Sequence, residues 1–219
     1  MTSKQVLVIG LGQFGLSLVR SLASVGVEVI AVDRAKEKVR LIANIAASVY
    51  CFDATEEAQL AALAPDRRDA CICAIGDESR ESSIICTALL RQLGARRVLA
   101  RATDPVHERI LGLIGAHEVV NPESVVGQRV AMRMAYEGVR DELTLGDDLV
   151  VTDVVAPLAL LGHSLAALEL PQRHDVTVAA IRRGDEVVMP RGDVTVQEGD
   201  ALILVSRPRK VMAMLEKLR

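Results

Sequence analysis

The sequence predicts an α/β fold in which a doubly wound parallel sheet of six strands is followed by a longer connecting helix and a small α+β module. Three observations support this prediction. Short apolar runs alternate with segments of helical periodicity from residue 5 to about residue 138. A glycine-rich turn follows the first apolar run. After residue 148 the pattern changes to β-branched runs separated by Gly-Asp pairs, which is typical of hairpins and turns.

The apolar runs of the first segment give the expected strands. They lie near residues 5–9, 27–32, 48–52, 70–75, 97–101 and 118–120, with helices between them. In a doubly wound sheet, ligands bind in the crevice outside the carboxyl ends of the strands. Those ends carry Gly10, Asp33, residues 53–55, residues 76–77, Arg101 and residues 121–123. We therefore expect the polar groups of a binding site to gather along this one rim.

The turn after the first strand has the pattern G-x-G-x-x-G in a Rossmann-like context. Gly10 lets the backbone turn sharply, Gly12 lets a diphosphate approach the helix N-terminus, and Gly15 lets the helix lie close to the sheet. Asp33 follows Gly15 by 18 residues, near the roughly 20 expected for an acid that binds a ribose diol. The pattern predicts a purine nucleotide site, and the alternative is an ordinary glycine turn beside an exposed Asp. Asp33 disfavours NADP, although Arg34 keeps NADP from being excluded.

Other residues at the same rim have two interpretations each. Residues 53–55 either contact an adenine edge or place Thr55 as the N-cap of a helix that begins near Glu56. Residues 76–79 either line the site or form a plain helix N-terminus. Arg101 ends a buried strand and requires an anionic partner, which is either a ligand phosphate or a carboxylate of the same chain.

The rest of the chain is predicted to contain a helix, a linker and a small module. The helix spans residues 122–140, and small side chains on one face (Gly127, Ala131 and Ala135) suit either a crossover between subunits or a last helix that covers the sheet. Residues 141–148 have few apolar side chains, which predicts a linker. The module has expected strands at 149–155, 176–182, 186–189 and 201–205 and a terminal helix at 209–218. The predicted domains are residues 1–121, 122–148 and 149–219.

Composition argues against several classes of function. The 219 residues carry a net charge of −3 and have a pI near 5.9, so the chain lacks the basic surface that nucleic-acid binding requires. No apolar run approaches the roughly 20 residues that span a bilayer. The first strand begins almost at the N-terminus, so we expect no signal peptide and a cytoplasmic location. The cysteines lack metal-site spacing and are expected to be small core residues: Cys51, Cys71, Cys73 and Cys86.

The sequence does not predict an enzyme. A dehydrogenase needs a substrate domain and a proton donor or acceptor beside the nicotinamide. The Tyr-x-x-x-Lys pair of short-chain reductases is absent, because Tyr50 and Tyr136 are followed four residues later by Ala54 and Arg140. A small NAD-dependent oxidoreductase remains the competing interpretation.

Six segments of the chain carry a resemblance to a known family. They are VIGLGQFG (8–15), AVD (31–33), DATE (53–56), CAIG (73–76), ARA (100–102) and ILGLIGAHEVVNPE (110–123). Together with EGDAL (198–202), they make the chain similar from end to end to the cytosolic RCK regulatory subunits (KTN/TrkA type) of bacterial Ktr and Trk potassium uptake systems. The resemblance implies an RCK N-lobe, a crossover helix and an RCK C-lobe.

The resemblance implies a regulator and not an enzyme. Such subunits pair through the crossover helix and form an octameric ring that docks on a potassium-translocating membrane protein, at the inner face of the cell membrane. The rings bind ATP or ADP, and in some members NAD(H), and the ligand changes the shape of the ring to gate transport. In some members the C-lobe binds cyclic di-AMP, for which Arg173 or His174 would serve.

The resemblance also assigns residues to the ligand. Asp33 holds the ribose, the glycine turn and Arg101 face the phosphates, and residues 53–55 lie near the base. The full set is Gly10, Gly12, Gln13, Phe14, Gly15, Asp33, Arg34, Asp53, Ala54, Thr55, Ile75, Gly76 and Arg101. Glu123 matches an acid that in some members helps to bind Mg²⁺, Ca²⁺ or Na⁺ at the dimer interface. The alternative is an acid favoured by the dipole at a helix N-terminus.

Two residues depart from the pattern of the family. Many members have Arg at the position of Gln13, where it reaches the terminal phosphate of the ligand in the neighbouring subunit. Gln13 therefore weakens discrimination of ATP over ADP or favours NAD(H). His117 replaces the usual Asp, with no evident consequence.

Overall fold

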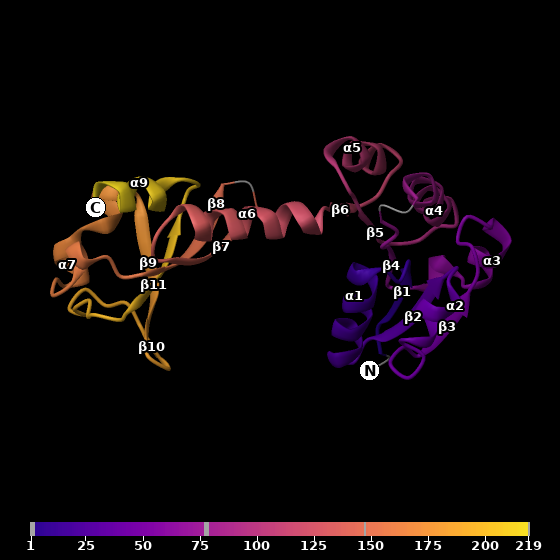
Figure 1. The fold of residues 1–219 in the computed structure, drawn as a ribbon, viewed down its shortest axis with the longest axis horizontal. Coiled ribbons are helices and arrows are strands. Elements are labelled where there is room, and N and C mark those ends of the chain that lie inside the picture. Colours follow the sequence, from indigo (N-terminus) through magenta and orange to yellow (C-terminus); the bar gives the residue numbers. More distant parts are fainter. Residues whose placement is uncertain (1–2, 77–78, 147, 219) are drawn as a thin grey trace. The chain divides into compact units, whose positions relative to one another are not determined.

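The computed structural model describes residues 3–76, 79–146 and 148–218. The chain divides into two compact units, Met1–Ser124 and Val125–Arg219 (Figure 1). The predicted domain boundaries differ slightly from this division and stay a prediction. Within the described ranges, no helix combines the length and the apolar character that crossing a membrane requires.

The N-terminal unit alternates strands with helices. In chain order these are β1 (Gln5–Ile9), α1 (Gln13–Ser24), β2 (Glu28–Asp33), α2 (Lys36–Arg40), β3 (Ser48–Cys51), α3 (Glu57–Ala62), β4 (Ala70–Cys73), α4 (Arg80–Gln92), β5 (Val98–Arg101), α5 (Pro105–Leu113) and β6 (Glu118–Val120). Among the described residues, six strands form one parallel sheet in the order β3-β2-β1-β4-β5-β6. The predicted doubly wound sheet is confirmed.

Both faces of this sheet are covered, which explains why its central strands are continuous apolar runs. Leu7 and Ile9 of β1 point to one face and pack with residues of α3, α4 and α5. Val6 and Val8 point to the other face and pack with residues of α1 and α2. One strand therefore supplies two separate cores, because successive side chains of a strand alternate between faces.

The C-terminal unit is built on an antiparallel sheet. Its elements are β7 (Val139–Leu145), β8 (Leu149–Val155), α7 (Leu165–Leu168), α8 (Leu170–His174), β9 (Val176–Arg183), β10 (Glu186–Val188), β11 (Ala201–Ser206) and α9 (Lys210–Lys217), preceded by the helix α6 (Pro122–Ala135). The strand order is β10-β9-β11-β8-β7 among the described residues. One face of the sheet packs with α8 and α9 around Val154, Leu202 and Met214. The predicted α+β module is confirmed.

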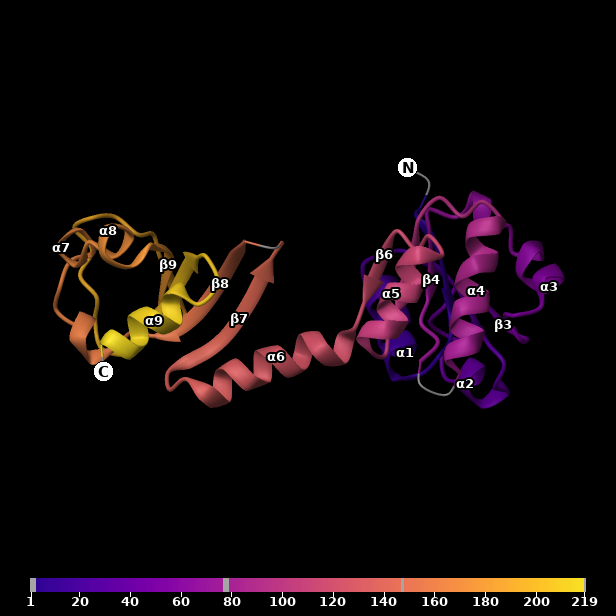
Figure 2. The ribbon, with the colours of Figure 1, turned by 90° about the horizontal axis from the view of Figure 1, so that it is seen from above.

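The expected linker at residues 141–148 is wrong, because residues 141–145 belong to β7 and pair with β8 as a hairpin (Figure 2). The helix predicted to reach residue 140 ends at Ala135, and Gly138 with φ +82° turns the chain into the strand. The strand was missed because β7 is an edge strand whose only buried residue is Val139. Gly146 (φ +66°) forms the turn to β8, and residue 147 lies outside the described residues.

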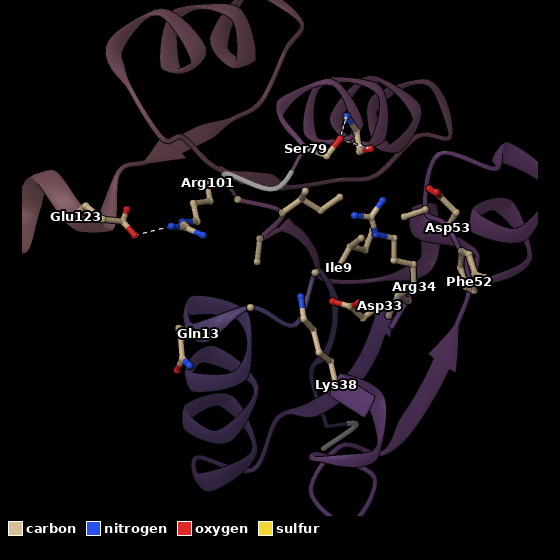
Figure 3. A pocket seen from close by; sticks show the side chains of 18 residues that line it. Ile9, Gln13, Asp33, Arg34, Lys38, Phe52, Asp53, Ser79, Arg101 and Glu123 are labelled. Atoms are coloured by element: carbon tan, nitrogen blue, oxygen red, sulfur yellow. Dashed lines mark hydrogen bonds and ion pairs between the residues drawn. The ribbon is translucent and has the colours of Figure 1, made fainter. Parts of the chain in front are cut away.

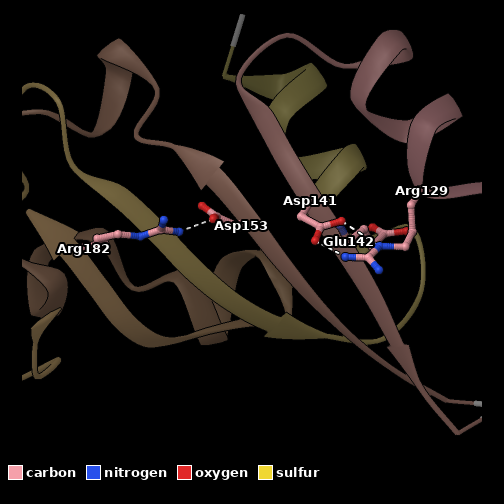
Figure 4. Close-up of polar contacts among 5 residues, drawn as sticks. All are labelled: Arg129, Asp141, Glu142, Asp153 and Arg182. Atoms are coloured by element: carbon pink, nitrogen blue, oxygen red, sulfur yellow. Dashed lines mark hydrogen bonds and ion pairs between the residues drawn. The ribbon is translucent and has the colours of Figure 1, made fainter. Parts of the chain in front are cut away.

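Charged side chains hold β7 in place. Arg129 of α6 donates through Nε to the Asp141 carboxylate at 2.9 Å and through its terminal nitrogen to the other oxygen (Figure 4). Burial raises the pKa of the neighbouring Glu142, whose carboxylate accepts from the Thr152 hydroxyl of β8 at 3.4 Å. These acids made the segment look like a linker, although they fasten it to both neighbours.

Cys51 also differs from its expected place. Cys71, Cys73 and Cys86 are buried, whereas Cys51 is exposed. The reason is that Cys51 ends β3, the edge strand of the parallel sheet, where helices cover less of the strand.

We predict that Asp200→Asn destabilises the protein. The Asp200 carboxylate is fully buried and accepts two bonds from Arg183, each 2.8 Å long, and one from the Gln197 amide. Loss of this charge-assisted pairing costs about 2–3 kcal/mol. Urea unfolding of the full chain at pH 7 measures the difference, and equal free energies of unfolding for the two proteins would contradict it.

The same pair predicts the sign of the pH dependence. The Arg183 guanidinium holds the pKa of Asp200 below its usual value. The stabilisation is therefore complete above the pKa of an unfolded Asp, about 3.9, and is lost as the pH falls through the lower folded pKa. We expect the difference between wild type and Asp200→Asn to shrink in urea unfolding below pH 4, whereas a constant difference would argue against this coupling.

Candidate functional site

A pocket of about 340 Å³ lies at the carboxyl ends of β1, β2, β4 and β5 (Figure 3). The residues that line it are Ile9, Gly10, Gly12, Gln13, Val32, Asp33, Arg34, Lys38, Phe52, Asp53, Ala54, Ala74, Ile75, Gly76, Ser79, Ser82, Arg101 and Glu123. All of them belong to the N-terminal unit. The pocket is thus at the rim where the sequence predicts a ligand.

The three glycines of the turn have different surroundings. Gly10 has φ +92°, and a Cβ there would lie 2.8 Å from the Ile75 nitrogen. A Cβ on Gly15 would lie 1.9 Å from the Gly10 carbonyl oxygen, so α1 packs directly on the turn. A Cβ on Gly12 would meet no atom within 4 Å. Gly10 and Gly15 are therefore required by the protein itself, whereas Gly12 leaves space that a ligand can fill.

Asp33 binds the glycine turn. Its Oδ2 accepts from the Leu11 amide at 2.6 Å, and its Oδ1 accepts from the Ala35 amide at 2.8 Å. The residue is only 8% exposed, so the alternative of an exposed Asp is wrong. A carboxylate has about four acceptor positions, so these two bonds leave capacity for the hydroxyl groups of a ligand.

Two cationic side chains extend into the pocket beside Asp33. Arg34 follows it directly, and Lys38 comes from α2 (Figure 3). Arg34 was among the predicted site residues, whereas Lys38 was not. The sequence did offer a signal for Lys38, because this residue lies in α2, the first helix after Asp33 at the carboxyl end of β2.

Asp53 lines the pocket, and Thr55 does not. The Asp53 carboxylate accepts from the Thr55 amide at 3.0 Å and from its hydroxyl at 2.8 Å, and these bonds hold the pKa of Asp53 below its usual value. The expected N-cap role of Thr55 is therefore wrong. The N-cap of α3 is Glu56, which makes no side-chain capping bond.

Arg101 pairs with a carboxylate of the same chain, which was one of its two expected partners. Its Nη2 lies 2.5 Å from Oε1 of Glu123, in the first turn of α6 (Figure 3). The Arg101 side chain is 11% exposed, and its Nε is buried without a hydrogen-bond partner among the described residues. A Cβ on Gly76 would lie 2.1 Å from Nη1, so the absence of that side chain makes room for the guanidinium.

The start of α4 completes the rim. Ser79 caps this helix by accepting from the Ser82 amide at 3.2 Å, and both serines line the pocket. Asp77 lies outside the described residues. Ser79 belongs to residues 76–79, which were expected either to line the site or to form a helix N-terminus, and it does both, whereas Ser82 was not predicted.

The remaining predicted residues have different positions. Ala54, Ile75 and Gly76 line the pocket, as does Gln13, whose side chain points away from Arg101 in Figure 3. Phe14 packs against the core between α1, α2 and the sheet instead. Apolar lining residues at the ends of the strands were not predicted: Ile9, Val32, Phe52 and Ala74.

The surroundings of Glu123 do not fit a metal site formed by this chain alone. No group of three or more His, Cys, Asp or Glu side chains that could hold a metal ion occurs in residues 3–76, 79–146 and 148–218. The partner of Glu123 is a guanidinium, which competes with a cation for the same carboxylate oxygen.

The chain matches two domain families and several named proteins over most of its length. Residues 6–122 match the TrkA-N domain and residues 149–219 match the TrkA-C domain. The Ktr system potassium uptake protein C of Bacillus subtilis (strain 168) is 34% identical over 203 residues, which cover 92% of this chain and 91% of that protein. The Ktr system potassium uptake protein A of Vibrio alginolyticus is 33% identical over 216 residues, 98% of each chain.

A solved structure shares the fold. The GsuK channel bound to NAD aligns with a TM-score of 0.70 over 99% of this chain and 39% of the channel chain, at 19% identity. These matches confirm the resemblance that the sequence motifs indicated. The chain belongs to the TrkA-type family of Ktr and Trk potassium uptake proteins, in which a TrkA-N domain precedes a TrkA-C domain.

Proposed function

We propose that this chain is the nucleotide-binding, cytoplasmic regulatory subunit of a potassium uptake system. One observation carries the proposal: the glycine turn and Asp33 meet at a pocket of the size and place that suit a nucleotide. The names of the Ktr relatives, which match this chain over nearly their whole length, support the connection to potassium uptake.

The proposed ligand is ATP, ADP or NAD(H). Its diphosphate lies over Gly12, where space is open and the first amides of α1 have no helical partner. Its ribose hydroxyl groups donate to Asp33, and its base lies toward Phe52 and Ala54. Gln13 supplies no positive charge for a third phosphate, which favours ADP or NAD(H). The NAD-bound state of the GsuK channel supports NAD as a ligand of this fold.

The acids of the pocket support a regulatory role over hydride transfer. A proton donor or acceptor must be available to the substrate. Asp33 already accepts from two backbone amides, Asp53 from Thr55, and Glu123 pairs with Arg101. Each of these carboxylates is therefore engaged by a partner in the protein, and we propose a binding protein and not an NAD-dependent oxidoreductase.

Assembly through α6 is the second part of the proposal. None of the residues described in α6 is buried. Val126, Val130 and Met134 follow one another at four-residue spacing and are 57%, 43% and 74% exposed. Such a stripe lies on one face of a helix and suits a second copy of the chain. We propose that these dimers form an octameric ring, which docks on an integral membrane potassium-translocating subunit at the inner face of the membrane and changes shape with the ligand.

Two further ligands remain expectations of the family. A cation near Glu123 would need oxygen donors from the nucleotide or a second copy, because this chain supplies a single carboxylate there. Cyclic di-AMP would bind the C-terminal unit, where a pocket of about 260 Å³ lies between residues 165–172, 177–178 and 190–192. Arg173 and His174 adjoin this pocket in sequence but do not line it, and Arg173 pairs with Glu169 at 3.2 Å.

We predict that Gly12→Ala weakens the binding of ADP and NADH while the protein stays folded. The added methyl group meets no protein atom, but it occupies space that the diphosphate needs. An overpacking cost of about 1.4–3 kcal/mol corresponds to affinity roughly 10- to 150-fold lower. Isothermal titration calorimetry of the full chain measures the affinity, and undiminished binding of both ligands would overturn the proposed site.

Two matched variants serve as controls for Gly12→Ala. Gly112→Ala also adds a methyl group in open space, but in α5 and away from the pocket, so its affinity for ADP equals that of wild type. Gly15→Ala places its Cβ against the Gly10 carbonyl, so we expect lower stability in urea unfolding. Together the two controls show whether Gly12→Ala weakens binding by filling the space of the ligand or by damaging the fold.

We predict that Met134→Glu separates subunits that pair through α6. A charge in an apolar stripe must be desolvated on association, which disfavours the dimer. Light scattering after size exclusion should give a smaller particle for Met134→Glu than for wild type. Val25→Glu, at an equally exposed position after α1, is the control and should keep the wild-type mass. A monomeric wild type, or a variant of unchanged mass, would count against pairing through this helix.

A further inference from the structure

We propose that Cys73 and Cys86 form a reversible disulfide that weakens ligand binding, so that the pocket responds to a peroxide oxidant as well as to its ligand. The disulfide itself is a modification of the protein core. Its effect on the ligand rests on the proposed nucleotide site.

The two thiols lie together in the core between β4 and α4. Cys73 is the last residue of β4 and Cys86 belongs to α4, and both are fully buried. The Cys73 sulfur lies 3.7 Å from both the carbonyl oxygen and the hydroxyl oxygen of Ser83. Because Cys86 follows Ser83 by three residues, it lies on the same face of the helix, and its thiol donates a hydrogen bond to the Cys73 sulfur.

This contact gives the two cysteines different reactivity. The hydrogen bond from Cys86 lowers the pKa of Cys73 to about 7 and raises the pKa of Cys86. Cys71, two residues earlier in β4, has no such donor, and burial raises its pKa to about 12. Since the thiolate is the nucleophile, Cys73 attacks the oxidant and Cys86 is the thiol that resolves the product.

The oxidant in this reaction is hydrogen peroxide. The Cys73 thiolate attacks one peroxide oxygen, so that an S–O bond forms, the O–O bond breaks, and the leaving hydroxide takes the former Cys73 proton and becomes water. The Cys86 sulfur then attacks the Cys73 sulfur. The S–S bond forms, the S–O bond breaks, and the second hydroxide leaves as water with the Cys86 proton. Two thiols and one peroxide thus give one disulfide and two waters, and a thiol reductant reverses the oxidation.

A disulfide at this place changes both walls of the pocket. It holds its sulfurs about 2 Å apart, closer than unbonded sulfurs can lie, so β4 and α4 must shift within a close-packed core. Cys73 leads directly into residues 74–76, and a Cβ on Gly10 would lie 2.8 Å from the Ile75 nitrogen, so little space separates this segment from the glycine turn. The first turn of α4 carries Ser79 and Ser82, which also line the pocket.

The ligand protects the thiols in return. Because both thiols are buried, peroxide reaches them only when the contact between α4 and β4 opens locally. A ligand that touches the start of α4 and the end of β4 stabilises the closed state. Coupling between two sites is reciprocal, so a disulfide that weakens ligand binding requires a ligand that disfavours the disulfide.

The test uses the full chain with Cys51→Ser, which removes the exposed thiol, before and after treatment with hydrogen peroxide. Mass spectrometry of proteolytic peptides should detect a link between residues 73 and 86, with the mass of two hydrogens lost. Calorimetry should give an ADP affinity about tenfold lower after oxidation. Dithiothreitol should reverse both changes, and excess ADP during the treatment should slow formation of the link.

Three variants in this background serve as controls, each compared with its own reduced form. Cys73→Ser and Cys86→Ser cannot form the link, so peroxide should leave their ADP affinity unchanged. Cys71→Ala keeps the pair and should respond to peroxide as the parent protein does. If one of the serine variants fails to fold, the other variant and the peptide map of the parent protein still decide.

The outcomes separate this inference from the proposed function. If the reduced protein binds neither ADP nor NADH, the nucleotide site is wrong, and so is the coupling, whereas the disulfide is still judged by the peptide map. If the reduced protein binds ADP but peroxide gives no link between residues 73 and 86, the site stands and the inference is wrong. A link that leaves the affinity for ADP unchanged would also overturn it.

Discussion

The bond between Asp33 and the Leu11 amide is the contact on which the site depends. It joins the carboxyl end of β2 to the glycine turn after β1, and so fixes the two groups that the proposed nucleotide contacts together. The carboxylate is nearly buried and accepts from two backbone amides, so its position is fixed by the main chain. Because both strands lie side by side in the sheet, their register determines where the acid meets the turn.

The helix α6 carries residues of both units. Its first turn carries Glu123, which lines the pocket, and its last turn carries Met132, which packs against the core of the C-terminal unit. A ligand switches a protein only by the difference in its affinity for two states, and a shift from 1:99 to 99:1 needs about 5.5 kcal/mol. In the proposed octameric ring, several identical pockets supply that difference together.

Much of the fold could be predicted because the parallel sheet is covered on both faces, so its strands are plain apolar runs such as residues 5–9. Edge positions gave no such signal: β7 and Cys51 were misplaced because burial there is partial. At the pocket, the glycine turn and Asp33 could be predicted from the spacing of the glycines and of the acid that follows them. Lys38 and Ser82 could not, because their place at the rim depends on where α2 and α4 begin relative to the sheet.

The described part of the pocket holds acidic and basic side chains in equal number, which is why Arg101 had two expected partners, a ligand phosphate and a carboxylate of the same chain. Among the described lining residues, Asp33, Asp53 and Glu123 oppose Arg34, Lys38 and Arg101. With no net positive charge among them to attract phosphates, the proposed binding of a diphosphate depends on the backbone amides at the start of α1 and on the space over Gly12.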